Sequence, residues 1–183
     1  MTTMDGLEHD VGKWDMLIAH PPCTYLTSSG AVRLFNPDHS VKDPERFAKG
    51  IAAVDFFRIF LQADIPMIAV ENPTPIKVFG LPRYSQIIEP FQFGDPWRKR
   101  TCLWLKGLPR LAATDVVEPE GLWVGSTSAR RVPNIHDRYR LNSIRDSKKR
   151  SKTFPGIARA MAEQWGGDIR KEETYGKTDT ECE

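Results

Sequence analysis

Short apolar runs and one helical pattern organise the first half of the chain. The run WDMLIA at 14–19 is almost wholly apolar, which is typical of a short strand buried on both faces of a parallel sheet. From 44 to 63, apolar residues recur at spacings of three and four, which predicts a helix with one buried face. The positions of that face are Phe47, Ile51, Val54, Phe57 and Leu61. A second apolar run at 67–70 predicts another strand, so strand, helix and strand form a crossover unit with two parallel strands.

Polar, proline-containing segments follow both predicted strands. The segment HPPCTYLTSSG at 20–30 must leave the sheet as a loop, because Pro21 and Pro22 cannot continue a central ladder. The second strand runs into ENPTP. Cys23 and Glu71 are therefore expected just after the carboxyl ends of their strands, where neighbouring parallel strands present residues to one crevice.

The second half of the chain predicts two more strands and a closing helix. The strands are expected at 86–91 and 101–105, on either side of the basic turn FGDPWRKR. Thr153 can cap a helix at 154–165 that Gly166 and Gly167 would end. Its buried stripe would be Ile157, Met161 and Trp165. The expected fold class is α/β.

Composition fits one globular domain. The chain has 183 residues, 40% of them hydrophobic, and this length can bury a sizeable core without a disulfide or a metal. We expect a polar leader at 1–13, a folded domain at 14–167 and a disordered acidic tail at 168–183. No apolar run reaches the roughly 18 residues of a membrane span, so no membrane partner is expected and the predicted location is cytoplasmic.

The three cysteines lie at 23, 102 and 182 and form no C-x-x-C pair, which argues against a metal site or a secreted disulfide framework. Cys23 on its rigid loop is either a nucleophile or a small buried hydrophobic residue. Cys102, inside the apolar run TCLWL, is expected to be structural. Glu71 follows a buried strand, so its carboxylate is either used in chemistry or paired in a salt bridge or helix cap.

Positive charge gathers near the end of the chain, although the whole chain has a net charge of only +2. Residues 128–152 contain nine Lys and Arg against two Asp, an excess of seven, and include Lys148, Lys149 and Arg150. Such a stretch is either a solvated loop or an electrostatic footprint for nucleic acid. Arg98, Lys99 and Arg100 could likewise contact phosphates or form a solvated turn.

Three motifs in this order, PPC at 21–23, ENP at 71–73 and FGDPWRKR at 93–100, resemble the DNA cytosine carbon-5 methyltransferases, and a compact phage and prophage branch most of all. The likeness covers about residues 14–110, with a looser one at TFPGIARAMAEQWG. It implies that 14–167 is a methyltransferase-like catalytic domain, with a truncated Rossmann-like sheet and catalytic loops at the strand ends.

The resemblance also implies roles for individual residues. Cys23 would attack cytosine carbon 6, while Glu71 hydrogen-bonds ring nitrogen 3 and the exocyclic amine, so that carbon 5 becomes nucleophilic. The methyl group would come from S-adenosylmethionine, and the partner would be DNA with its target base flipped out of the stack. Residues implied in substrate binding are Pro22, Asn72, Arg98 and Arg100.

Departures from the family pattern leave three functions open. No Gly-rich turn precedes Trp14, and Trp97 directly precedes Arg98 where the family usually has Gln. The segment from 107 to 153 is short for a target-recognition region. One possibility is a methyltransferase catalytic half that needs a cofactor-binding half from a second chain or a longer reading frame. The others are a pyrimidine-modifying enzyme that does not use S-adenosylmethionine, and a catalytically silent nucleic-acid-binding remnant.

Overall fold

The computed structural model describes residues 14–122 and 152–173, which fall into two compact units. The first unit comprises 14–88 and 100–110, and the second comprises 89–99, 111–122 and 152–173. The expected basic residues Lys148, Lys149 and Arg150 and the expected leader at 1–13 lie outside the described residues. Among the helices of the described part, none is long and apolar enough to cross a membrane.

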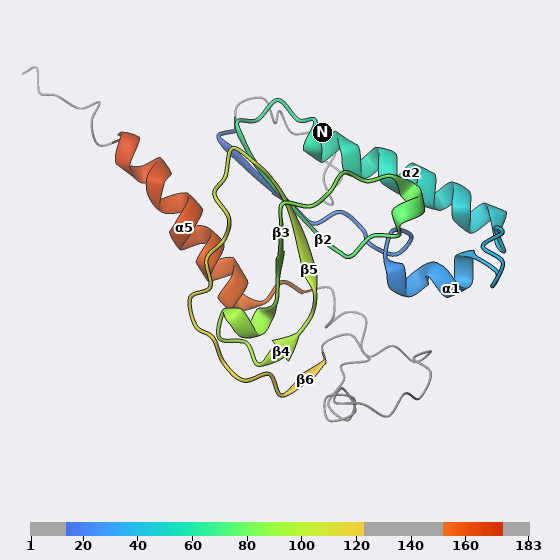
Figure 1. The fold of residues 1–183 in the computed structure, drawn as a ribbon. Helices are drawn as coiled ribbons and strands as arrows, with labels where there is room; N and C mark the ends of the chain where they lie inside the picture. The colour runs from blue at the N-terminus through green and yellow to red at the C-terminus, as the bar shows by residue number, and fades with distance from the viewer. Residues whose placement is uncertain (1–13, 123–151, 174–183) are drawn as a thin grey trace, which may run out of the picture. The chain divides into compact units, whose positions relative to one another are not determined.

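A four-stranded mixed sheet forms the centre of the first unit (Figure 1). Its order is β1 (Met16–Ala19), β2 (Met67–Pro73), β5 (Thr101–Lys106) and β3 (Gln86–Ile88). β1 and β2 are parallel, with Ala19 opposite Val70, whereas β5 is antiparallel to both β2 and β3. The α/β class and the parallel pair joined by a helix are confirmed, and the sheet as a whole is mixed.

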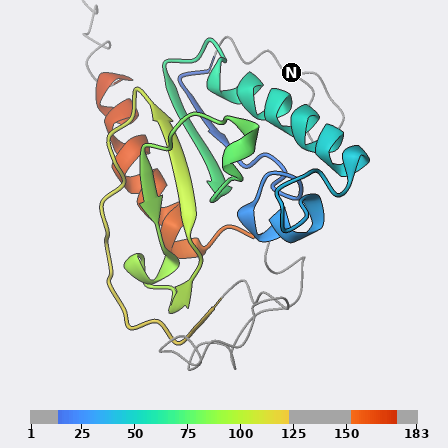
Figure 2. The ribbon, with the colours of Figure 1, turned by 45° about the vertical axis from the view of Figure 1, so that its right-hand side comes forward.

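The helix α2 (Pro44–Leu61) joins β1 to β2 and packs against β2 (Figure 2). Its start follows from local chemistry. Pro44 occupies the first turn, where no amide donor is needed, and the Asp43 side chain accepts a hydrogen bond of 2.9 Å from the Arg46 amide. The expected helix is confirmed and ends at Leu61 rather than at 63.

The expected buried face of α2 is wrong at one position. Ile51 is 44% exposed, and the neighbouring Gly50 is buried instead. A Cβ atom at Gly50 would clash with Cζ of Phe79, so the missing side chain makes room for the aromatic ring. The hydrophobic pattern could not reveal this, because glycine carries no apolar side chain for a periodicity to register.

The core of the first unit lies between α2 and the sheet. Phe57 is fully buried and meets Trp104 of β5 edge to face, with ring centroids 4.9 Å apart. The indole nitrogen of Trp104 donates a 2.7 Å hydrogen bond to the Pro82 carbonyl, so the buried ring is also satisfied at its polar edge. The buried cluster contains Ala19, Leu26, Leu34, Val54, Phe57, Phe60, Ile65, Ile68, Val70, Phe79, Cys102 and Trp104.

The strand expected at 86–91 is shorter in the structure. β3 ends at Ile88, and the chain turns into a short 3-10 helix, η4 (Pro90–Gln92). Pro90 has no amide hydrogen for a ladder. The Glu89 amide instead donates to Oε1 of Gln92 at 2.8 Å, in a reciprocal capping box.

The second unit holds two short parallel strands, β4 (Trp97–Arg98) and β6 (Gly121–Leu122), and the helix α5 (Pro155–Glu173). Ile157, Met161 and Trp165 are buried, as expected. The expected end at Gly166 and Gly167 is wrong, because the helix continues to Glu173. Glycine ends a helix when it adopts a left-handed conformation, and neither glycine does so.

The amino end of α5 is held by a residue distant in sequence. The Gly156 amide donates a 3.0 Å hydrogen bond to Oδ2 of Asp95, which belongs to FGDPWRKR. Part of that motif therefore stabilises the second unit, because a carboxylate is favourable beside the amide groups of a helix start.

Candidate functional site

The carboxyl ends of β1 and β2 bring the PPC and ENP segments together. The register that pairs Ala19 with Val70 places the next residues, His20 and Glu71, side by side. Nδ2 of Asn72 donates a buried 2.9 Å hydrogen bond to the Pro21 carbonyl. The loop that carries Cys23 is thus attached directly to the strand that carries Glu71 and Asn72.

Glu71 and Asn72 lie within a strand, which corrects the expectation that they follow one. β2 continues to Pro73, with Glu71 opposite Leu103 and Asn72 opposite Cys102 of β5. The antiparallel partner β5 supplies the ladder that carries β2 beyond the apolar run. As a result the side chain of Glu71 is only 10% exposed and Asn72 is 2% exposed.

Two buried oxygen atoms at this edge lack a hydrogen-bond donor among the described residues. They are Oε2 of Glu71 and Oδ1 of Asn72. Nδ1 of His20 lies 3.0 Å from Oε2, within ion-pair distance but not aligned for a hydrogen bond. An unsatisfied buried polar group costs about 1–3 kcal/mol, so such atoms at a strand end are suited to a ligand that supplies donors.

The Cys23 loop is fastened at both ends. The carbonyl of Cys23 accepts hydrogen bonds from the amides of Leu26 and Thr27, at 3.1 and 3.2 Å, which closes a tight turn. Beyond the turn, Ser28 donates to the Thr74 carbonyl and the carbonyl of Leu26 accepts from Ile76. Cys23 itself is half-buried and carries a free thiol.

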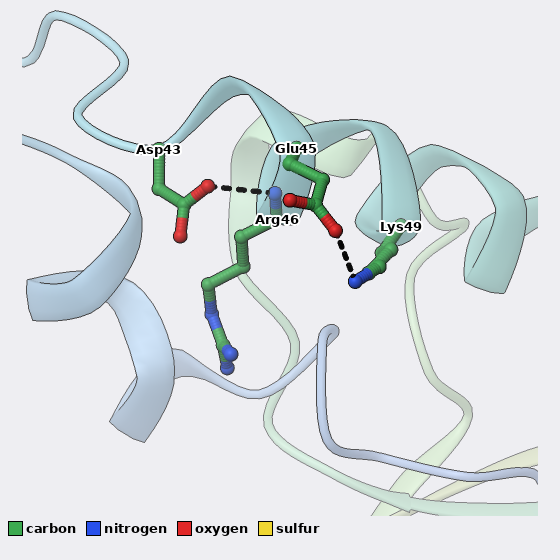
Figure 3. Close-up of polar contacts among 4 residues, drawn as sticks. All are labelled: Asp43, Glu45, Arg46 and Lys49. Atoms are coloured by element: carbon green, nitrogen blue, oxygen red, sulfur yellow. Dashed lines mark hydrogen bonds and ion pairs between the residues drawn. The ribbon is translucent and has the colours of Figure 1, made fainter.

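Arg46 supports this loop from α2, although no sequence motif singled it out. Nη2 of Arg46 donates a 3.0 Å hydrogen bond to the carbonyl of Thr24, the residue after Cys23. Its guanidinium also lies over the Tyr25 ring, 5.0 Å from the centroid. Figure 3 shows the Arg46 side chain extending away from the first turn of α2, where Asp43 binds its amide.

The residues of FGDPWRKR are divided between the two units. Arg98 belongs to β4 in the second unit, where its guanidinium lies 5.1 Å from the centroid of the Phe91 ring. Lys99, in the same unit, lies over the ring of Phe154.

Arg100, by contrast, belongs to the first unit. It is exposed and directly precedes Thr101, the residue of β5 that pairs with Pro73 of β2. Arg100 therefore lies at the strand edge that carries Glu71 and Asn72.

The two described cysteines differ sharply in environment. Cys102 is fully buried, and burial raises the pKa of its thiol above the ordinary value, against a smaller opposing effect of the Thr74 hydroxyl 3.8 Å away. We therefore expect limited iodoacetamide labelling at neutral pH, followed by peptide mass spectrometry, to modify Cys23 well before Cys102. A Cys182→Ser background removes the third thiol. Earlier labelling of Cys102 would contradict the assignment of Cys23 as the accessible nucleophile.

Comparisons of the chain with protein-family models, with curated proteins and with solved structures found no match. The functional argument therefore rests on the site itself.

Proposed function

We propose that this chain is a cytosine-modifying catalytic unit of the DNA cytosine carbon-5 methyltransferase type, built on a truncated Rossmann-like sheet. In this proposal Cys23 adds to carbon 6 of the base, and Glu71 and Asn72 bind the polar edge of the ring. The observation that carries it is the attachment of the Cys23 loop to the Glu71 strand through the Asn72 hydrogen bond to Pro21. A nucleophile and a buried carboxylate at one strand edge are the two groups that this chemistry needs.

The electron flow explains why both groups are required. The Cys23 thiolate forms a bond to carbon 6, and the carbon 5–carbon 6 π pair moves to join carbons 4 and 5. The carbon 4–nitrogen 3 π pair then moves onto nitrogen 3, which takes a proton from the Glu71 carboxyl group. The product is an enamine whose carbon 5 can attack an electrophile. Without the acid, negative charge would build up on nitrogen 3 of the ring and raise the free energy of the transition state. A preorganised proton donor neutralises that charge as it forms.

The unsatisfied oxygens at the site suit the exocyclic amine of cytosine. That amine has two hydrogens to donate, and Oε2 of Glu71 and Oδ1 of Asn72 are buried acceptors with no donor among the described residues. Pro22 stiffens the loop on which Cys23 lies, and Arg100, exposed at the same strand edge, is suited to a phosphate. The proposed partner is DNA with the target base turned out of the stack.

S-adenosylmethionine, which would supply the methyl group, is not matched by the residues around this edge. Nucleoside cofactors bind α/β sheets against a glycine-rich turn at the end of a strand. Here β1 is followed by His20, Pro21 and Pro22, and β2 by Thr74 and Pro75. These turns do not fit the cofactor, so the proposed steps are those of base binding and thiol addition.

Hydrogen exchange at carbon 5 tests the proposal without a methyl donor. The enamine can take a deuteron from D₂O at carbon 5, and loss of the original proton with expulsion of Cys23 then returns deuterated cytosine. We expect the chain to catalyse this exchange in a cytosine-containing oligonucleotide, as measured by mass spectrometry of the recovered nucleosides. Deoxycytidine monophosphate, tested in parallel, distinguishes a polynucleotide substrate from a free nucleotide.

The exchange rate with the protein is compared with the rate in a control without protein. Exchange no faster than in the protein-free control, for both the oligonucleotide and the nucleotide, would contradict the proposed thiol addition. Exchange in the nucleotide alone would retain the addition chemistry but overturn DNA as the substrate.

A further inference from the structure

His20 stands between solvent and the buried carboxylate of the site. Its side chain is 45% exposed, while that of Glu71 is 10% exposed, and Nδ1 lies 3.0 Å from Oε2. His20 directly follows β1, so the same strand end positions the imidazole and the Cys23 loop. An imidazole gains and loses its proton near neutral pH, and one that touches both water and a buried acid can carry protons between them.

Among the described residues of the first unit, no charged side chain other than His20 forms an ion pair with Glu71. On β5 the residue opposite Glu71 is the apolar Leu103, and the charged residues at the two ends of that strand are the exposed Arg100 and Lys106. Lys106 donates to the Ala63 carbonyl at the far end.

The loop after β1 holds two further titratable residues, Cys23 and Tyr25. Cys23 is the proposed nucleophile, and the Tyr25 ring lies against the guanidinium of Arg46. Among the described residues, His20 is therefore the side chain that forms an ion pair with Glu71.

We propose that His20 supplies the proton that Glu71 delivers to the base, an inference that rests on the proposed function and deepens it. When the Cys23 thiolate bonds to carbon 6, nitrogen 3 takes the carboxyl proton and leaves Glu71 as a carboxylate. The imidazolium of His20, whose ring is partly exposed, turns to align its Nδ1–H with Oε2 and passes that proton to the carboxylate. This leaves a neutral imidazole that keeps its proton on Nε2, and Nδ1 then takes a replacement proton from water. Each addition thus consumes one solvent proton, and the reverse elimination returns it.

His20 is accordingly a positioning and proton-supplying residue that acts through Glu71. The alternative is that its ring only props the carboxylate in place. Two variants separate these roles. His20→Asn keeps a planar polar group that can donate a hydrogen bond but cannot release a proton, whereas His20→Ala leaves a space open to solvent that free imidazole can enter.

The test is the carbon 5 exchange assay, run between pH 5 and 8 on full-length variants. General acid catalysis typically contributes at least about 100-fold, so both variants should lose about that factor in rate. The ratio of the wild-type rate to the His20→Asn rate should fall as pH rises through the range in which imidazole loses its proton, because the dependence on the Cys23 thiolate is common to both proteins and cancels in the ratio. Added imidazole should restore exchange in His20→Ala in proportion to its concentration.

His39→Asn is the matched control. His39 is exposed in a turn with a φ of 66°, a conformation that Asn tolerates, and it lies outside the site. This variant should exchange at the wild-type rate.

If the wild type exchanges and His20→Asn does so equally at every pH, the proton-supply role is wrong while the proposed function stands. If imidazole fails to restore exchange in a folded His20→Ala, the ring has only a structural role. If the wild type itself does not exchange, the proposed function fails first.

Discussion

Replacing Glu71 with Gln is expected to lower carbon 5 exchange by about 10²- to 10³-fold, the usual cost of removing one preorganised electrostatic partner of a transition state. Gln has nearly the same shape but an amide in place of the acid, so it cannot protonate nitrogen 3. Because the backbone of Glu71 pairs with Leu103 in either case, β2 should remain intact. Mass spectrometry of the exchanged cytosine gives the rate.

Glu45→Gln provides the matched control for this change. Glu45 lies on the first turn of α2, exposed and paired with Lys49 at 2.6 Å (Figure 3). Removing its charge touches no atom of the proposed site, so exchange should remain at the wild-type rate. Equal losses in the two variants would mean that the effect of Glu71 is not specific to the site.

The second large effect concerns stability. Phe57→Ala should lower the free energy of unfolding by about 3–5 kcal/mol, because it leaves a cavity beside Trp104 that the surrounding core cannot fill. Urea denaturation followed by circular dichroism should show a lower midpoint with an unchanged slope, since the surface exposed on unfolding is nearly the same.

The neighbouring Phe56 is the control on the same helix. It is 41% exposed and touches Phe60 at its edge, with ring centroids 5.0 Å apart. Phe56→Ala removes the same atoms from a half-exposed position and should cost much less than Phe57→Ala. A similar cost for both would mean that the assignment of the core face of α2 is wrong.

The elements that local patterns predict well are those with strong local signals. β1 and the first part of β2 are short apolar runs, and α2 combines helical spacing with an Asp43 cap and Pro44. The direction of β5 could not be predicted, because a short apolar run is compatible with both parallel and antiparallel pairing. Pairing with β5 carries β2 as far as Pro73 and so places Glu71 inside the strand.

The candidate site was predictable only in part, for a related reason. PPC and ENP could be placed at neighbouring strand ends from order and composition. His20 and Arg46 act through contacts fixed by strand register and by a helix distant from the loop, which leave no local signature. Residues of the basic turn also make contacts that no local pattern indicates, since Arg98 packs on Phe91 in the second unit and Asp95 holds the start of α5.

The most direct test of the account is mass spectrometry of a covalent complex between the chain and an oligonucleotide that carries pyrimidin-2-one at the target position. This base lacks the exocyclic amine and is more electrophilic at carbon 6, so a thiol adduct can accumulate without a methyl donor. The account predicts an adduct on the peptide that contains Cys23, and no adduct in Cys23→Ser. An adduct on Cys102 or Cys182, or none with the folded wild-type chain, would contradict it.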